Sequence, residues 1–382
     1  MLPQLNVFFP GKLVFANGCI ENISAEIKAL DAKVVFIVTI EPLVSIIDKH
    51  IVSLQQTGVA VHINTSITQE PYFSDFENIL AHAAPLNPDV VIGIGGGSVL
   101  DIAKLVAAQL DNQQTLRDYV GIGLLKGRKK KLICIPTTAG TGSEVSPNAI
   151  LVDNEDNQKK GIISPYLVPD IVFVDPLLTI SLPSAITAAT GMDALTHCLE
   201  AYTNKFAQPF IDMFALEGIR LIAGHIETAV TNGADVVARE KVAMGSLLGG
   251  FCLGPVNTAA VHALSYPLGS LYHLSHGLSN ALLLPYVMEF NIVGSEKRYA
   301  EVAIALGCAK EATDQLTALA GVEKIKQLNA ACGIPATLKE VGVEFSSLEQ
   351  MAKDAMKIQR LLKNNPREVT EALALEIFKK AF

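Results

Sequence analysis

The sequence predicts an α/β fold for the first half of the chain and an all-helical second half. Up to about residue 180, short apolar runs rich in β-branched residues alternate with helical patterns, which is typical of a parallel sheet covered by helices on both faces. Beyond that point the strand pattern fades and long helical patterns follow one another. A chain of 382 residues is long enough for two domains. We therefore expect an α/β domain over residues 1–180 and a helical domain over residues 181–382.

Individual elements follow from the same patterns. The expected strands are 34–39, 59–63, 89–94, 132–136 and 171–174, together with an extended N-terminal segment up to residue 15. The expected helices are 41–57, 72–84 and 98–109 in the first half, and 183–202, 209–232, 235–249 and 257–271 in the second. More helices are expected from there to residue 382.

Composition and charge exclude several classes of function. The net charge of −8 leaves no electrostatic surface for a phosphate backbone, so we expect no nucleic-acid partner, and the one basic run, 126–131, is interpreted as a solvated turn. Residues 242–288 contain no Asp, Glu, Lys or Arg, but Pro, Asn and His interrupt them repeatedly, so we expect a buried core and not membrane spans. The N-terminus has no secretory signal pattern, and no two of the six cysteines are spaced as CxxC. We expect a cytoplasmic protein.

Two polar loops follow predicted strands. Residues 93–101, GIGGGSVLD, lie between a strand and a helix, where glycines allow close approach and free N–H groups favour an anion such as a diphosphate. The spacing matches neither GxGxxG nor a P-loop, and a tight turn without a ligand is the alternative. Residues 136–144, PTTAGTGSE, combine hydroxyls and glycines after another strand. Since ligands of open α/β sheets bind beyond the carboxyl ends of strands, both loops are candidates for one nucleotide site.

A second group of residues has the chemistry of metal ligands. Asp193 and His197 are four residues apart and share one helix face. His262 and His276 lie in the charge-free stretch, where a buried imidazole needs a hydrogen bond or a metal. Together the four form a one-carboxylate, three-imidazole set that suits Fe(II) or Zn(II), and that leaves positive charge to polarise an alcohol or carbonyl oxygen. The Asp193–His197 pair alone is equally explained by a carboxylate–histidine hydrogen bond, and His262 or His276 alone is more often a core histidine satisfied by hydrogen bonds.

These segments, taken together, resemble a known family. GIGGGSVLDIAK, PTTAGTGSEVS, GMDALTHCLEAY and VHALSYPLG with HGLSNALLLP are similar in order and spacing to the signature segments of the iron-containing alcohol dehydrogenases, across essentially the whole chain. The resemblance implies a dehydroquinate synthase-like architecture, with a nucleotide-binding α/β domain followed by a helical metal-binding domain. It implies NAD(P), Fe(II) or Zn(II), a small alcohol or aldehyde substrate, and a homodimer or larger homo-oligomer.

The resemblance also implies roles for individual residues. The implied metal ligands are Asp193, His197, His262 and His276. The implied cofactor residues are Gly95, Gly96, Gly97, Ser98, Asp101, Thr137, Thr138, Thr141, Ser143 and Lys159. Where many NAD-preferring members carry an Asp after the second strand, this chain has Ile40 followed by Glu41, which leaves the choice between NAD and NADP open. Some members have a histidine where this chain has Tyr266, so we consider His273 as a proton relay or, equally, as a histidine satisfied within the protein.

Other functions fit the same pattern. A hydroxyacid, hydroxybutyrate or glycerol dehydrogenase would share the architecture, as would a dehydroquinate synthase, although GMDALTH and HGLSNA favour the alcohol dehydrogenases. A non-catalytic nucleotide-binding relative would be expected to lose a ligand or the glycine loop, and all are present here.

Overall fold

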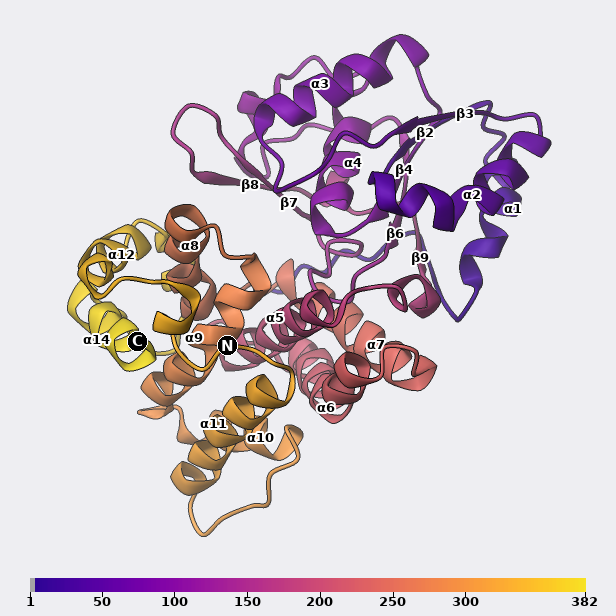
Figure 1. Cartoon of the computed structure of the whole chain (residues 1–382). Helices are drawn as coiled ribbons and strands as arrows, with labels where there is room; N and C mark the ends of the chain where they lie inside the picture. The colour runs from indigo at the N-terminus through magenta and orange to yellow at the C-terminus, as the bar shows by residue number, and fades with distance from the viewer. Residues whose placement is uncertain (1–3) are drawn as a thin grey trace. The chain divides into compact units, whose positions relative to one another are not determined.

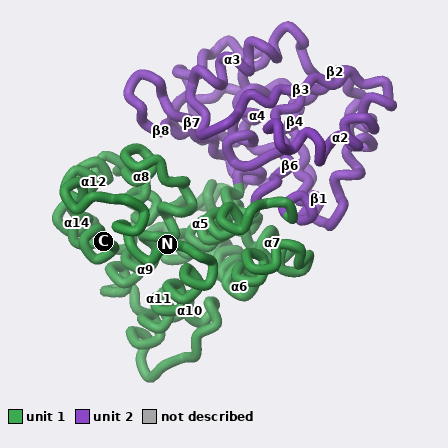
Figure 2. The backbone as a smooth tube through the Cα atoms, in the orientation of Figure 1, with its two compact units in different colours: residues 1–7, 139–142, 180–382 green, residues 8–138, 143–179 purple. Residues whose placement is uncertain are grey.

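The computed structural model describes residues 4–382, which form two compact units (Figure 2). The sheet unit comprises residues 8–138 and 143–179, and the helical unit comprises residues 1–7, 139–142 and 180–382. The helical unit is therefore built from three separate segments of the chain. A single domain boundary at residue 180 stays a prediction.

The sheet unit is organised around a six-stranded sheet in which every neighbouring pair is parallel (Figure 1). In spatial order its strands are β1 (Lys12–Phe15), β9 (Ile171–Val174), β6 (Lys131–Pro136), β4 (Val90–Gly95), β2 (Val34–Val38) and β3 (Ala60–Asn64). The predicted parallel sheet is confirmed, and β2, β3, β4, β6 and β9 begin and end within one residue of expectation. The extended N-terminal segment is shorter than predicted, because residues 4–11 form no strand and residues 1–3 lie outside the described part of the chain.

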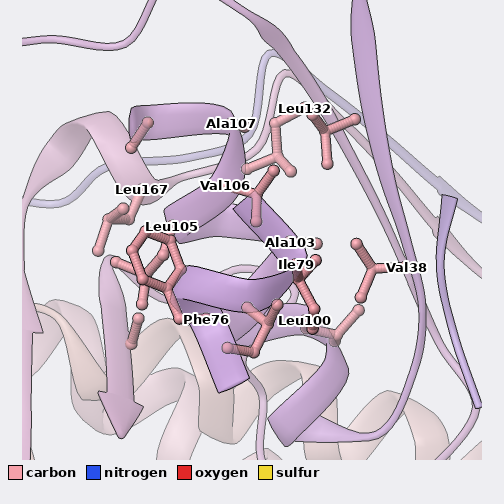
Figure 3. Packing of buried hydrophobic residues seen from close by; sticks show 14 of the residues in the cluster. Val38, Phe76, Ile79, Leu100, Ala103, Leu105, Val106, Ala107, Leu132 and Leu167 are labelled. Carbon is pink, nitrogen blue, oxygen red and sulfur yellow. The ribbon is translucent and has the colours of Figure 1, made fainter. Parts of the chain in front are cut away.

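The strands are apolar at nearly every position because both faces of the sheet are buried. Val35 and Ile37 of β2 pack with α1 (Ile23–Ala29) and α2 (Glu41–Gln56). Phe36 and Val38, one residue out of phase, pack with α3 (Phe73–Ala83) and α4 (Gly97–Gln109). Successive side chains of a strand point to opposite faces, so in a strand covered on both faces nearly every side chain is buried and apolar. Figure 3 shows the second of these cores, with Leu100, Ala103 and Val106 of α4 beside Val38.

A second, smaller sheet was not predicted. It consists of β5 (Gly121–Ile122), β8 (Lys159–Ile163) and β7 (Asn148–Val152), with β7 and β8 antiparallel. Strand β7 contains a short apolar run, residues 149–152, that was not predicted to be a strand, whereas β8 begins with two lysines and lacks the apolar run that marks the main sheet.

The helical unit packs long helices against one another (Figure 1). They are α5 (Ser184–Thr203), α6 (Pro209–Thr231), α7 (Val236–Leu253), α8 (Ala260–Tyr272), α9 (His276–Ile292), α10 (Glu296–Ala305), α11 (Asp314–Ala331), α12 (Leu348–Ala355), α13 (Gln359–Leu362) and α14 (Glu371–Ala381). Short 3-10 helices of the whole chain cover Cys19–Asn22, Ala84–Leu86, Leu116–Tyr119, Pro165–Leu167, Pro176–Thr179, Lys339–Val341 and Phe345–Ser347. Helix α8 starts three residues later than predicted, after Asn257, whose φ of 73° is not helical. Within residues 4–382 no helix combines the length and the apolar character needed to cross a membrane.

Candidate metal and cofactor sites

Three helices of the helical unit carry the predicted metal ligands. Asp193 and His197 lie on α5, His262 is the third residue of α8, and His276 is the first residue of α9. Asp193, His197 and His262 are buried, and the His276 side chain is 34% exposed. The structure therefore brings together residues up to 83 positions apart (193 to 276) in the sequence, with one partly open side.

The spacing of the four side chains suits a divalent metal. One ligand atom from each lies within 4.8 Å of the others. Asp193 Oδ1 is 3.8 Å from His197 Nε2, 3.6 Å from His262 Nε2 and 3.8 Å from His276 Nε2. Ligands bound tetrahedrally at roughly 2.0–2.2 Å lie about 3.4 Å from one another, close to these values. The Nε2 atom of His262 is buried without any hydrogen-bond partner, as expected of an atom whose partner is a metal ion.

Electrostatics favour a charged carboxylate among the imidazoles. Burial raises the pKa of Asp193, but the neighbouring histidines outweigh burial and hold that pKa well below its usual range. Burial lowers the pKa of His197. Burial also acts to lower the pKa of His262, yet the carboxylates of Glu200 and Asp193 outweigh it and raise that pKa to about 10.

Neighbouring groups hold the ligands in position. The carbonyl of Gly140 accepts from His197 Nδ1 at 3.2 Å, and Glu200 Oε2 accepts from His262 Nδ1 at 2.6 Å. Asn280 Nδ2 donates to Asp193 Oδ1 at 2.7 Å. Sequence reasoning missed these groups, although spacing signals existed. Glu200 follows His197 by three residues on α5, and Asn280 follows His276 by four on α9.

The glycine loop of the sheet unit lies where the strand order reverses. From β2 the chain continues to β3 on one side, whereas β4, β6 and β9 lie on the other side of β2. Residues 95–98 follow β4 and open α4, and Gly96 is the N-cap of that helix with an extended conformation. A ligand site is expected at such a switch point, where the helix N-terminus offers free N–H groups to an anion. Thr137 and Thr138 follow the neighbouring strand β6, and Thr137 N donates to the Gly95 carbonyl.

Two other predicted cofactor residues are joined in a buried network. Asp101 Oδ1 accepts from Ser143 Oγ at 2.5 Å, and Asp101 Oδ2 accepts from the backbone N–H of Ile150 at 2.9 Å. Lys104, fully buried, donates to Ser143 Oγ at 2.8 Å and to the carbonyls of residues 146 and 148. This network ties α4 to the segment that leads into β7.

The remaining predicted residues are more scattered. Thr141 belongs to the helical unit, and Lys159, on β8, forms an ion pair with Glu70 at 2.5 Å. Ile40 is the N-cap of α2 and packs against the core, and Glu41 is the exposed first residue of that helix. His273 ends α8 in a left-handed conformation and is exposed.

Comparisons with known proteins agree with this arrangement. The family model for the iron-containing alcohol dehydrogenases matches residues 10–176, and the model for the C-terminal part of the Fe-containing alcohol dehydrogenase family matches residues 187–382. The chain belongs to the iron-containing alcohol dehydrogenase family. It is thus an oxidoreductase that transfers hydride between an alcohol and a nicotinamide cofactor, with iron as the family's metal. The predicted family, fold class and reaction are confirmed.

Named relatives show the range of substrates in the family. Long-chain-alcohol dehydrogenase 1 of Geobacillus thermodenitrificans is 39% identical, over 98% of this chain and 96% of the relative. The 1,3-propanediol dehydrogenase of Citrobacter freundii is 34% identical, over 100% and 98%. The structure of sulfoacetaldehyde reductase from Bifidobacterium kashiwanohense in complex with NAD+ superposes with a TM-score of 0.89 at 26% identity, covering 99% of each chain.

Proposed function

We propose that this enzyme interconverts primary alcohols and aldehydes, with Fe(II) held by Asp193, His197, His262 and His276. The observation that carries the proposal is the buried Nε2 atom of His262, which has no hydrogen-bond partner and belongs to a group of four ligand atoms within 4.8 Å. Zn(II) has the same preference for imidazole and carboxylate, so it is the natural substitute in experiments.

The roles of the chain's own residues follow from their positions. The three imidazoles and one carboxylate hold the cation, and the glycine loop before α4 directs backbone N–H groups at the cofactor diphosphate. Asp101 and Ser143 stiffen that loop's helix through their hydrogen bond. When bound, the metal polarises the alcohol or carbonyl oxygen and the nicotinamide accepts or gives the hydride. We assign a proton-relay role to the exposed His273, which a His273→Gln variant would reveal as a changed pH profile of turnover.

The proposed substrate class is supported by the names of relatives that act on long-chain alcohols and on 1,3-propanediol. The test is a panel of primary alcohols and the matching aldehydes of increasing length, assayed with NADH and NADPH after loading with Fe(II) and analysing the metal content. We expect turnover on the panel that depends on bound metal. Because Ile40 packs on the core and Glu41 is exposed, we expect less than about a hundredfold preference between the cofactors, or about 2.7 kcal/mol. No turnover by the metal-loaded protein on any member would contradict the proposal.

A second candidate is the reduction of an aldehyde that carries a carboxylate or sulfonate. One observation favours it: Arg360 Nη2 donates to Tyr266 Oη at 2.7 Å, and the Tyr266 ring lies 6.2 Å from the ring of His276. Within residues 4–382 no ion pair is found for Arg360, so its charge is not neutralised by a carboxylate. Anionic aldehydes belong in the same panel. If they are preferred, Arg360→Gln should raise their KM and leave that of neutral aldehydes unchanged.

A further inference from the structure

Glu200 is a buried carboxylate beside the metal ligands, and no Lys or Arg side chain pairs with it in the described part of the helical unit; its side-chain partner is His262. It lies on α5 three residues after His197 and is 3% exposed. A buried carboxylate is costly unless hydrogen bonds compensate for the lost water. The donors of the hydrogen bonds to Glu200 therefore indicate its role.

Three donors surround Glu200, and all belong to the start of one helix. Oε2 accepts from the backbone N–H of Ala259 at 3.0 Å and from His262 Nδ1 at 2.6 Å. Oε1 accepts from the backbone N–H of Val261 at 2.6 Å. Three donors and no acceptor are the surroundings of an ionised carboxylate, which can only accept.

Two of these bonds fix the N-terminus of α8. The N-cap residue of α8, Ala259, has no side chain that could satisfy the free N–H groups of the first turn. Glu200, which lies on α5, caps α8 instead by accepting from its free N–H groups. The negative charge of Glu200 is favourable at the positive end of the α8 dipole. The carboxylate therefore sets where α8 begins relative to α5. His262, the third residue of α8, is placed by the same bonds.

The third bond fixes the tautomer of His262. With Nδ1 donating to Glu200, Nε2 is the nitrogen available as a ligand, and it faces Asp193 Oδ1 at 3.6 Å. A histidine ligand held in this way keeps its ring orientation and is a stronger electron donor to the metal.

The charge of Glu200 also completes the electrostatics of the site. A divalent cation bound by the single carboxylate of Asp193 and three neutral imidazoles would leave a buried net charge of +1. The carboxylate of Glu200, one imidazole away, balances that charge. Burying a balanced set costs far less than burying an unpaired charge.

We infer that Glu200 is a positioning residue for the metal centre: it fixes the start of α8 and the tautomer of His262, and thereby sets the affinity for the cation. This inference rests on the proposed function, because it assumes that the four ligands bind a metal. It assigns to Glu200 no contact with substrate or cofactor.

Glu200→Gln is the informative substitution because it keeps the shape and removes the charge. A glutamine has one accepting oxygen, whereas both carboxylate oxygens accept here. If its oxygen faces His262, its NH2 group opposes the N–H of Val261. If its NH2 group faces His262, it donates to Nδ1 and drives the proton to Nε2, which then cannot bind a metal. Glu200→Asp keeps the charge on a side chain one methylene shorter, and it should partly restore the parental affinity.

The first measurement is the dissociation constant for Zn(II), by competition with a chromophoric chelator, in the full-length parent and the variants. We expect Glu200→Gln to weaken binding by roughly 10–100-fold and Glu200→Asp to fall between it and the parent. Thr203→Val is the matched control. Thr203 is also buried on α5 and bonds the Leu199 carbonyl, but it touches no ligand, so affinity should stay within about twofold of the parent.

The second measurement is made on the parent protein and so does not depend on whether the Glu200 variants fold. In the Zn(II)-loaded parent, NMR with 15N-labelled histidine should show a downfield, slowly exchanging Nδ1 proton on His262, assigned by its loss in His262→Gln. A parent that binds no Zn(II) or Fe(II) refutes the proposed function itself. A parent that binds Zn(II) but lacks this proton, or a folded Glu200→Gln variant with parental affinity, refutes the role of Glu200 alone.

Discussion

At the scale of single residues, two of the candidate ligand histidines differ in the group that accepts the hydrogen bond from Nδ1, the ring nitrogen that does not face the metal site. His197 donates to the carbonyl of Gly140, a neutral acceptor, whereas His262 donates to the carboxylate of Glu200. A charged acceptor makes the stronger hydrogen bond and the more electron-rich imidazole. We therefore expect His262 to contribute more than His197 to metal affinity.

Removal of the His262 imidazole tests whether this residue is a metal ligand. His262→Ala should lose bound Fe(II) or Zn(II) and turnover together, and should weaken affinity by more than the roughly 10–100-fold typical of residues that only support a ligand. Metal content by elemental analysis is measured beside turnover, with circular dichroism to verify the helices. His225→Ala is the control, since His225 bonds its own helix at the Leu221 carbonyl. Full metal occupancy in His262→Ala would remove His262 from the site.

Glu144 gives the sheet unit a pH-dependent stability. Burial raises its pKa from the usual 4.5 to about 7. Because the folded state holds this proton more tightly than the unfolded chain, the contribution of Glu144 to the free energy of unfolding is largest below pH 4.5, falls as the pH rises to about 7, and changes no further above that. The loss is about 3 kcal/mol at 1.36 kcal/mol per pH unit.

Glu144→Gln should abolish the pH-dependent contribution of Glu144 to the free energy of unfolding. The urea midpoint of the variant, relative to that of the parent, should therefore be higher at pH 8 than at pH 5. Urea unfolding of both proteins at the two pH values measures the difference. Glu155→Gln, at an exposed carboxylate, should show no such trend. An equal difference at both pH values would mean that Glu144 ionises normally in the folded protein.

At the scale of elements, the close approach of α5 and α9 places Asp193 beside His276. Gly277 makes this approach possible, because a Cβ atom there would lie 2.2 Å from the Ala189 carbonyl oxygen and 3.2 Å from Asp193 Cβ. Backbone atoms cannot yield as a flexible side chain does, so a methyl group would push the helices apart.

Gly277→Ala should therefore destabilise the protein by about 1–3 kcal/mol and weaken Zn(II) binding as well. Gly224→Ala is the matched control: a Cβ atom at this α6 position meets nothing within 4 Å, and alanine should stabilise by about 0.5–1 kcal/mol. Chemical denaturation and chelator competition report the two effects. Parental Zn(II) affinity in Gly277→Ala would show that the ligands do not depend on this helix contact.

In the loop before α4, unlike at Gly277, the fold leaves room for a Cβ atom. A Cβ atom at Gly96 would lie 3.4 Å from Thr138 Cγ2, an ordinary contact, and the φ of −77° suits any residue. The protein itself therefore does not require glycine at this position. We expect Gly96→Ala to fold like the parent but to bind NADH at least about tenfold more weakly, because the methyl group occupies the diphosphate's place. Fluorescence titration measures the affinity, and Gly127→Ala, on an open loop, is the control. Unchanged affinity would exclude this loop as the diphosphate site.

The sequence predicts an element well when neighbouring residues carry its pattern, and poorly when its role depends on contacts with distant residues. Strands β2, β4 and β9 of the main sheet are apolar because both of their faces are buried, and the ends of all strands of this sheet except β1 lie within one residue of the prediction. In the hairpin, β8 begins with two lysines and has no such pattern, and the apolar run of β7 spans only residues 149–152, too short to be told from a loop or a helical turn. The four candidate metal ligands were predicted from residue type and spacing, and the structure brings them together. Glu200 and Gly140 were missed because their roles depend on contacts with residues about 60 positions away.

At the scale of the whole molecule, metal binding and folding are linked. The four ligands come from three helices, and the unfolded chain has no preformed site, so a bound cation stabilises the folded state. Zn(II) at a hundred times its dissociation constant should add about 2.7 kcal/mol to the free energy of unfolding. We expect EDTA to lower the thermal unfolding midpoint of the enzyme and graded Zn(II) to restore it. Ca(II), which takes six or more oxygen ligands, should have no effect. A midpoint independent of saturating Zn(II) would contradict this link.

The division of the helical unit into three chain segments has a consequence for synthesis on the ribosome. Residues 139–142 are translated in the middle of the sheet unit, yet the carbonyl of Gly140 holds a ligand that is 57 residues further along. At about 5–20 residues per second, His197 emerges roughly 3–11 s after its acceptor. This four-residue segment is therefore made before α5, the helix that carries His197. The metal centre can therefore form only after the last strand has been made, and a premature stop between residues 180 and 193 would leave a chain with every strand of the main sheet and none of the four candidate ligands.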